Sequence, residues 1–113
     1  IVRGTTTSRV IEMIKEAGAK EVHMRVSSPP ITSPCFFGVD MATTSELIAN
    51  QYNIEEIRKI IGADSLGFLS IDALQKSVNS KKNNYCKACF TGNYPIPVQL
   101  DFDKFHLEKI KQK

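Results

Sequence analysis

Three cysteines are the residues of this 113-residue chain whose type and spacing most clearly indicate chemistry. Cys86 and Cys89 form a C-x-x-C pair, and Cys35 lies far upstream of them. Thiolates two residues apart can bind a single metal ion or two corners of an iron–sulfur cluster. Such a site needs four ligands, so the cysteines predict an incomplete set that lacks one member.

The other uses of these cysteines are less well supported. A thioredoxin-type redox pair favours a helix start that follows a strand, whereas Cys86 follows a polar segment. A disulfide is disfavoured because no secretory feature is present and the odd count leaves one thiol over. His23 and His106 could complete the ligand set, but their positions are more typical of structural or exposed histidines. Spacing alone therefore favours a metal or cluster, with zinc and iron ranked equally and buried unpaired cysteines as the alternative.

The segment Arg3-Gly4-Thr5-Thr6-Thr7 is the second candidate site. It lies between an apolar strand end and a helix start, where backbone N–H groups and the helix dipole favour an anion such as phosphate. The glycine allows close approach of the backbone, the threonine hydroxyls add donors, and the arginine adds charge. Ordinary helix capping explains the same pattern, and no P-loop lysine follows at the required spacing.

The elements that position these residues follow from apolar periodicity and capping signals. Helices are predicted over residues 7–17, 43–50, 53–61 and 70–78, and strands over 22–26 and 66–69. Thr6 or Thr7 is the expected N-cap of the first helix, and Thr43 and Glu46 have capping-box spacing at the start of the second. The expected buried stripe of the first helix consists of Val10, Ile11, Ile14 and Ala17. That of the third helix consists of Ile57, Ile60 and Ile61. The remainder after residue 78 is expected to be loop-like through Pro95 and Pro97, and 105–110 a final amphipathic stretch.

Strands separated by helices favour an α/β layer with parallel pairing. Two short strands do not make a stable sheet alone, so we expect the rest of the sheet to lie upstream. The opening residues Ile1-Val2-Arg3-Gly4 support this expectation, because an apolar pair that runs into a loop is typical of a strand end. We therefore expect the natural polypeptide to extend beyond residue 1.

Composition narrows the function classes. The hydrophobic fraction of 42% and charged fraction of 24% are ordinary for a globular protein. No apolar run approaches the ~20 residues of a membrane helix, and no signal peptide is present. The net charge of +3 is small and not concentrated, so no nucleic-acid partner is expected. A cytoplasmic protein without a membrane partner is predicted.

Together these segments resemble a known family. Residues 1–6 resemble the end of the phosphoribosylpyrophosphate loop of type I phosphoribosyltransferases. The amidophosphoribosyltransferase family is similar over nearly the whole chain up to about Pro97, through residues 18–22, 27–31, 34–40, 55–58, 61–66 and 86–95. The implied fold is α/β, the C-terminal part of a type I phosphoribosyltransferase fold over residues 1–80, with a mostly parallel sheet flanked by helices. A helical, cluster-binding tail is implied over 81–113.

The resemblance also implies an activity. The family transfers ammonia, released from glutamine in a separate N-terminal domain, to C1 of phosphoribosylpyrophosphate, which gives 5-phosphoribosylamine and pyrophosphate in purine synthesis. The implied substrate-binding residues, around the sugar 5-phosphate, are Arg3, Gly4, Thr5 and Thr6. No catalytic residue is expected within these 113 residues, so the chain alone is expected to be inactive. The implied partners are phosphoribosylpyrophosphate, glutamine and further copies in a homo-oligomer.

Two cofactors follow from the resemblance. One branch of the family binds a [4Fe–4S] cluster, and its ligand pattern falls on Cys35, Cys86 and Cys89, with a fourth cysteine upstream. Membership of this branch, which the C-x-x-C pair implies, favours iron over zinc. The cluster is expected to have a structural rather than a redox role. Mg²⁺ is implied with ligands upstream of Ile1. The competing functions are a nucleotide-sensing regulator that shares the fold and a small zinc-binding interaction module.

Overall fold

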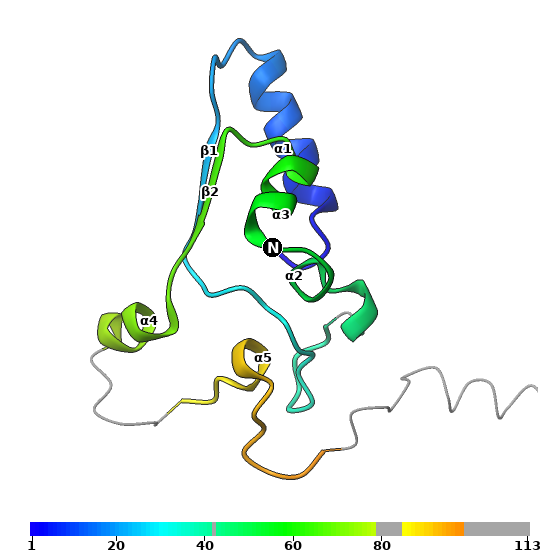
Figure 1. The fold of residues 1–113 in the computed structure, drawn as a ribbon, viewed down its shortest axis with the longest axis vertical. Coiled ribbons are helices and arrows are strands. Elements are labelled where there is room, and N and C mark those ends of the chain that lie inside the picture. The colour runs from blue at the N-terminus through cyan, green and yellow to red at the C-terminus, as the bar shows by residue number, and fades with distance from the viewer. Residues whose placement is uncertain (42, 79–84, 99–113) are drawn as a thin grey trace, which may run out of the picture.

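The computed structural model describes residues 1–41, 43–78 and 85–98 (Figure 1). Along the chain, the elements are α1 (Thr5–Glu16), β1 (His23–Val26), the 3₁₀ helix η1 (Thr44–Glu46), α2 (Ile48–Gln51), α3 (Ile54–Ile61), β2 (Ser65–Phe68), α4 (Ile71–Ser77) and α5 (Ala88–Thr91). This order confirms the predicted alternation of helices and strands.

The two strands pair in parallel, in a register that runs from His23 opposite Ser65 to Val26 opposite Phe68. In Figure 1 they lie side by side, with α1 and α3 on one side of them. The outward residues of β1 are exposed and the alternate residues are partly buried, as the sequence pattern predicts. The prediction of an α/β arrangement with parallel pairing is therefore confirmed.

The core lies between the strands and the helices that precede each of them. Its buried members come from α1, α2, α3 and the turn after α3, namely Ile11, Ile48, Ile57, Ile61 and Ala63. Met24 and Leu66 pack against this cluster from the two strands. Ile57 and Ile61 are four residues apart and therefore share one face of α3, the face that meets the sheet.

Part of the predicted apolar stripes is exposed. Ile60 is 47% exposed, because successive residues are rotated by roughly 100° around a helix and it therefore turns away from the face of Ile61. Val10 and Ile14 are 44% and 43% exposed, so α1 is buried at Ile11 alone within the described residues. Ala17 is exposed as well. The predictions for these four residues were wrong because the helices contact their neighbours along narrow lines.

The ends of α3 follow the sequence signals closely. Asn53 is the N-cap, and its side chain accepts a hydrogen bond from the backbone N–H of Glu56 at 2.9 Å. Glu56 completes a capping box by accepting from the backbone N–H of Asn53. Gly62 closes the helix in the left-handed conformation, with φ of 77°.

Three local predictions need correction. Helix α1 begins at Thr5 after Gly4, without a side-chain cap, so neither Thr6 nor Thr7 is its N-cap. The predicted helix over 43–50 is divided into η1 and α2 by the extended, fully buried Leu47, although its capping box is present. Helix α5 lies in a segment predicted to be a loop, because a single helical turn has too little periodicity to be recognised.

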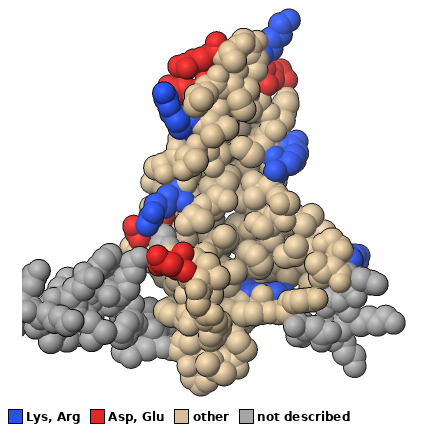
Figure 2. Space-filling model, turned by 180° about the vertical axis from the view of Figure 1, so that it is seen from behind, with Lys and Arg blue, Asp and Glu red and all other residues tan. Residues whose placement is uncertain are grey.

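Several predictions lie outside the described residues, including the amphipathic stretch 105–110 and His106. The predicted boundary at residue 80, between the phosphoribosyltransferase part and the cluster-binding tail, also lies outside the described residues. Among the described residues, no helix combines the length and apolar character needed to cross a membrane. Figure 2 shows acidic and basic side chains interspersed over the face opposite to that of Figure 1.

Candidate functional site

The start of α1 forms an open helix terminus. Gly4 adopts the left-handed conformation with φ of 85°, and its carbonyl accepts the first helical hydrogen bond from Ser8 at 3.0 Å. Backbone N–H groups in the first turn of a helix have no acceptor within the helix. Thr5 and Thr6, the first two residues of this turn, are exposed. This arrangement suits an anion such as a phosphate group.

The loop before α1 packs against the first residue of α2. Gly4 itself is buried, and a Cβ atom there would lie 2.9 Å from Cδ1 of Ile48. The backbone N–H of Ile48 donates to the carbonyl of Val2 at 2.9 Å. The sequence analysis assigned Gly4 to close approach of an anion, and the structure adds a close approach to α2 as a second reason for glycine.

Arg3 is held by an acidic partner that sequence reasoning did not connect to it. Its Nη2 lies 3.1 Å from Oε1 of Glu46, and both side chains are about half exposed. Oε2 of Glu46 accepts from the backbone N–H and the hydroxyl of Thr43, each at 3.0 Å. The Thr43 N–H, followed by its hydroxyl and then Arg3, lowers the pKa of Glu46. The capping-box spacing identified Glu46, but its contact with Arg3 depends on tertiary structure.

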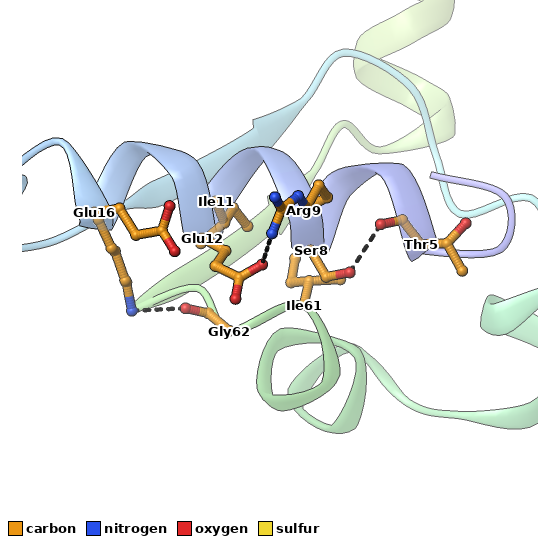
Figure 3. Close-up of a pocket in the computed structure, with 9 residues that line it drawn as sticks. Thr5, Ser8, Arg9, Ile11, Glu12, Glu16, Ile61 and Gly62 are labelled. Carbon is orange, nitrogen blue, oxygen red and sulfur yellow. Dashed lines mark hydrogen bonds and ion pairs between the residues drawn. The ribbon is translucent and has the colours of Figure 1, made fainter.

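An open groove of about 690 Å³ runs along α1 from Thr5 toward the end of α3 (Figure 3). It was not predicted from the sequence. The groove is lined by Thr5, Ser8, Arg9, Ile11, Glu12, Lys15, Glu16, Ile61 and Gly62. Its basic groups already have partners, since Arg9 pairs with Glu12 at 2.7 Å and Lys15 donates to the carbonyl of Gly62 at 2.7 Å. The groove therefore offers mixed charge, and Thr5 connects it to the start of α1.

The cysteine-bearing segments lie against each other. The backbone N–H groups of Thr32 and Ser33 both donate to the carbonyl of Cys89, at 2.9 and 3.1 Å. The hydroxyl of Tyr94 donates to the carbonyl of Pro34 at 2.7 Å. The Tyr94 ring also packs edge-on against Phe36, with 5.2 Å between ring centroids. Protein contacts thus join the loop that carries Cys35 to α5.

The thiols differ in their exposure. Cys35 and Cys89 are partly buried, Cys86 is exposed, and none of the three forms a disulfide. Burial is the main cause that raises the pKa of the Cys89 thiol, and electrostatic interaction with Cys35 and Cys86 raises it further.

Proximity does not amount to a formed metal site. Within residues 1–41, 43–78 and 85–98, no group of three or more His, Cys, Asp or Glu side chains is arranged to hold a metal ion. His23 lies elsewhere, on β1, where it contacts Glu21 at 2.9 Å and Ser65 at 2.8 Å. Three cysteine thiolates are suitable donors for an iron–sulfur cluster. The structure brings the loop at Cys35 into contact with α5, but it does not arrange the three thiols as a ligand set.

The sequence is similar to several curated proteins. The chloroplastic amidophosphoribosyltransferase of Vigna aconitifolia is 55% identical over 96 residues, which cover 85% of this chain and 20% of the relative. The amidophosphoribosyltransferase of Bacillus subtilis is 51% identical over 105 residues, which cover 89% and 22%. That of Methanothermobacter thermautotrophicus is 50% identical over 105 residues, which cover 93% and 22%. No family model matches the chain.

The backbone is similar to two solved structures. The Bacillus subtilis glutamine phosphoribosylpyrophosphate amidotransferase, complexed with ADP and GMP, has a TM-score of 0.83 at 49% identity. The match covers 95% of this chain and 24% of that one. A structure described as the allosteric regulatory enzyme of purine biosynthesis has a TM-score of 0.79 at 50% identity, covering 89% and 23%. These matches show that the described elements are part of a type I phosphoribosyltransferase fold.

The chain spans about one fifth of the length of the curated relatives that it matches. Identity of about one half extends over most of its own length, and the helices and strands are arranged as in the solved enzymes. The chain therefore belongs to the amidophosphoribosyltransferase family.

Proposed function

We propose that this chain is the part of an amidophosphoribosyltransferase that holds the 5-phosphate of phosphoribosylpyrophosphate. The observation that carries the proposal is the start of α1, where Gly4 turns the chain, no side chain caps the first-turn amides, and Thr5 and Thr6 are exposed. The name of the similar Bacillus subtilis structure includes phosphoribosylpyrophosphate, which supports this choice of anion.

In the proposed reaction, ammonia released from glutamine attacks C1 of the sugar. A C–N bond forms at C1, the C–O bond to pyrophosphate breaks, and pyrophosphate leaves with the bonding electron pair. The 5-phosphate does not react. Its binding at the start of α1 positions C1 relative to ammonia, so that binding energy contributes to the chemical step.

Mg²⁺ would neutralise the departing pyrophosphate. We propose that its ligands lie outside the 113 residues, as the resemblance to the amidophosphoribosyltransferases implies. The glutamine-hydrolysing groups are also assigned outside this chain. The chain alone is accordingly proposed to be inactive, and turnover of both substrates by it would contradict that assignment.

The phosphate assignment is tested by titrating ribose 5-phosphate into the chain and following its backbone amides by NMR. We expect the amides of Thr5, Thr6 and Thr7 to shift. Thr5→Ala should weaken binding about tenfold, the effect of losing one hydrogen bond to a charged group. Gly4→Val should weaken binding for a different reason, because a side chain at this positive φ would push the loop away from Ile48. Free ribose, which lacks the phosphate, is the matched ligand control and should leave these amides unchanged.

The same variants can be measured in an enzyme. In a chimera that carries this chain in place of the corresponding segment of the Bacillus subtilis enzyme, both should raise KM for phosphoribosylpyrophosphate or lower kcat. Unchanged ribose 5-phosphate binding in both variants of the chain would show that the start of α1 is not the phosphate site.

We further propose that Cys35, Cys86 and Cys89 supply three ligands of a [4Fe–4S] cluster and that a fourth thiolate comes from outside the 113 residues. The proposal is supported by the soft thiolate donors and by the contacts that bring the loop at Cys35 against α5. Displacement at C1 moves no electrons through a metal. A bound cluster would therefore supply a covalent link between these segments rather than redox chemistry.

Metal analysis tests this assignment in the chimera. We expect iron together with acid-labile sulfide, and we expect both to fall in Cys35→Ser and Cys89→Ser. Zinc without sulfide would instead support a zinc-binding module. Oxygen treatment, followed by visible absorbance and protease sensitivity together, tests the structural role. Loss of absorbance without increased cleavage would contradict it.

The proposed assembly is a cytoplasmic homo-oligomer. The exposed apolar residues Val10, Met13 and Ile14 on α1 support a further packing partner for that helix. The plant relatives are named as chloroplastic, whereas the names of the bacterial and archaeal relatives carry no compartment.

A further inference from the structure

We propose that Glu46 is a positioning residue for the phosphate-binding loop, and that its fixed carboxylate orients Arg3 beside the start of α1. This inference rests on the proposed function, because it concerns the same phosphate site. It adds a residue that lies outside the loop itself and that the sequence analysis treated only as part of a helix cap.

The carboxylate of Glu46 is itself held in place. Its Oε2 accepts two hydrogen bonds from Thr43, and the next residue, Leu47, is fully buried. The backbone on both sides of the carboxylate is thus fixed by a capping box and by the core. Only Oε1 is directed to Arg3, at 3.1 Å from Nη2.

Arg3 is the group that gains from such a fixed partner. It is a long, half-exposed side chain directly before Gly4, and holding such a side chain in one rotamer costs conformational entropy. The pairing with Glu46 incurs part of this cost before any ligand arrives. An arginine has five N–H donors, so one contact with Glu46 leaves others to donate to a phosphate oxygen.

The same segment also fixes the backbone of the loop. Ile48, two residues after Glu46, donates its N–H to the carbonyl of Val2 and packs where a side chain on Gly4 would lie. The loop is therefore held at two points: the backbone of Val2 bonds to Ile48, and the side chain of Arg3 pairs with Glu46. Both contacts come from residues 46–48, which makes this short stretch the support for the phosphate loop.

The positioning role predicts a sign opposite to that of simple electrostatics. Glu46 carries a negative charge near a proposed anion site, so Coulomb repulsion alone predicts that its removal tightens phosphate binding. If Glu46 instead orients Arg3, its removal weakens binding. The direction of the change therefore distinguishes a positioning residue from a charge that is merely nearby.

The experiment measures the dissociation constant of ribose 5-phosphate by NMR titration of the chimera, in which this chain replaces the corresponding segment of the Bacillus subtilis enzyme. We expect Glu46→Ala to weaken binding about fivefold. Glu46→Gln should weaken it less, because an amide oxygen can still accept from Arg3 or from Thr43. The matched control is Glu56→Ala, which removes the corresponding glutamate from the capping box of α3. It should leave ribose 5-phosphate binding unchanged.

A second measurement follows Arg3 directly. In the ligand-free chimera, the Nε–H signal of Arg3 should broaden or shift toward solvent-averaged values in Glu46→Ala and remain unchanged in Glu56→Ala. Binding by Glu46→Ala that is equal to or tighter than wild type would overturn the inference while leaving the proposed function intact. An equal loss in Glu56→Ala would also overturn it, by indicating general destabilisation. Absence of binding by the chimera without these substitutions would contradict the proposed function and the inference together.

Discussion

At Gly4, a backbone conformation and a packing contact both disfavour a side chain. The left-handed φ of 85° disfavours any residue with a Cβ atom, and a Cβ atom there would lie 2.9 Å from Cδ1 of Ile48, which would have to move. Gly18 has a similar positive φ of 105°, but nothing lies within 4 Å of the Cβ position there. A substitution at Gly18 therefore tests the energetic cost of the backbone conformation alone, whereas one at Gly4 adds the cost of displacing Ile48.

We predict that Gly18→Ala lowers the free energy of unfolding by about 1 kcal/mol, the strain of a left-handed residue. Gly4→Ala should lower it by about 1 kcal/mol more, because the buried Ile48 side chain must move. Urea unfolding of the two variants and wild type measures the difference. Equal losses in the two variants would mean that Ile48 adjusts without cost.

At the scale of elements, Asp64 joins three of them. Its Oδ2 accepts from the backbone N–H of Val22 at 2.7 Å, immediately before β1. The same oxygen lies 3.5 Å from Nζ of Lys15, near the end of α1. Asp64 itself lies between α3 and β2. The Val22 N–H is the main cause that lowers the pKa of Asp64, and Lys15 and His23 lower it further.

This lowered pKa predicts a pH dependence. The folded-state pKa of Asp64 lies below the ordinary value of 3.8, so its contribution to stability is complete above that value and is lost as the pH falls through the folded pKa. Asp64→Asn should therefore be less stable than wild type at neutral pH, with a difference that shrinks toward pH 2. Chemical unfolding at several pH values tests this expectation. Asp72→Asn, which removes an exposed carboxylate on α4, is the control.

The sequence predicted much of the molecule as a whole, because many of its signals are local. Asn53 and Gly62 act through their own backbone geometry, and they begin and end α3 close to the bounds predicted for that helix. Burial depends instead on which neighbour covers a residue, so Ile60 could not be assigned from its own helix. The pairing of Arg3 with Glu46 joins residues 43 positions apart, and no local pattern encodes it.

The parallel register of β1 and β2 bears on the order in which the chain folds. His23 and Ser65 pair across 42 positions, and closing a loop of that length costs about 3 kcal/mol of chain entropy before the strands compensate for it. Helix α3 lies within that loop and has its own caps at both ends, so the contacts that start this helix are local and do not require the loop to close. We therefore expect strand pairing to be a late, slow step, with α3 already formed when β2 reaches β1.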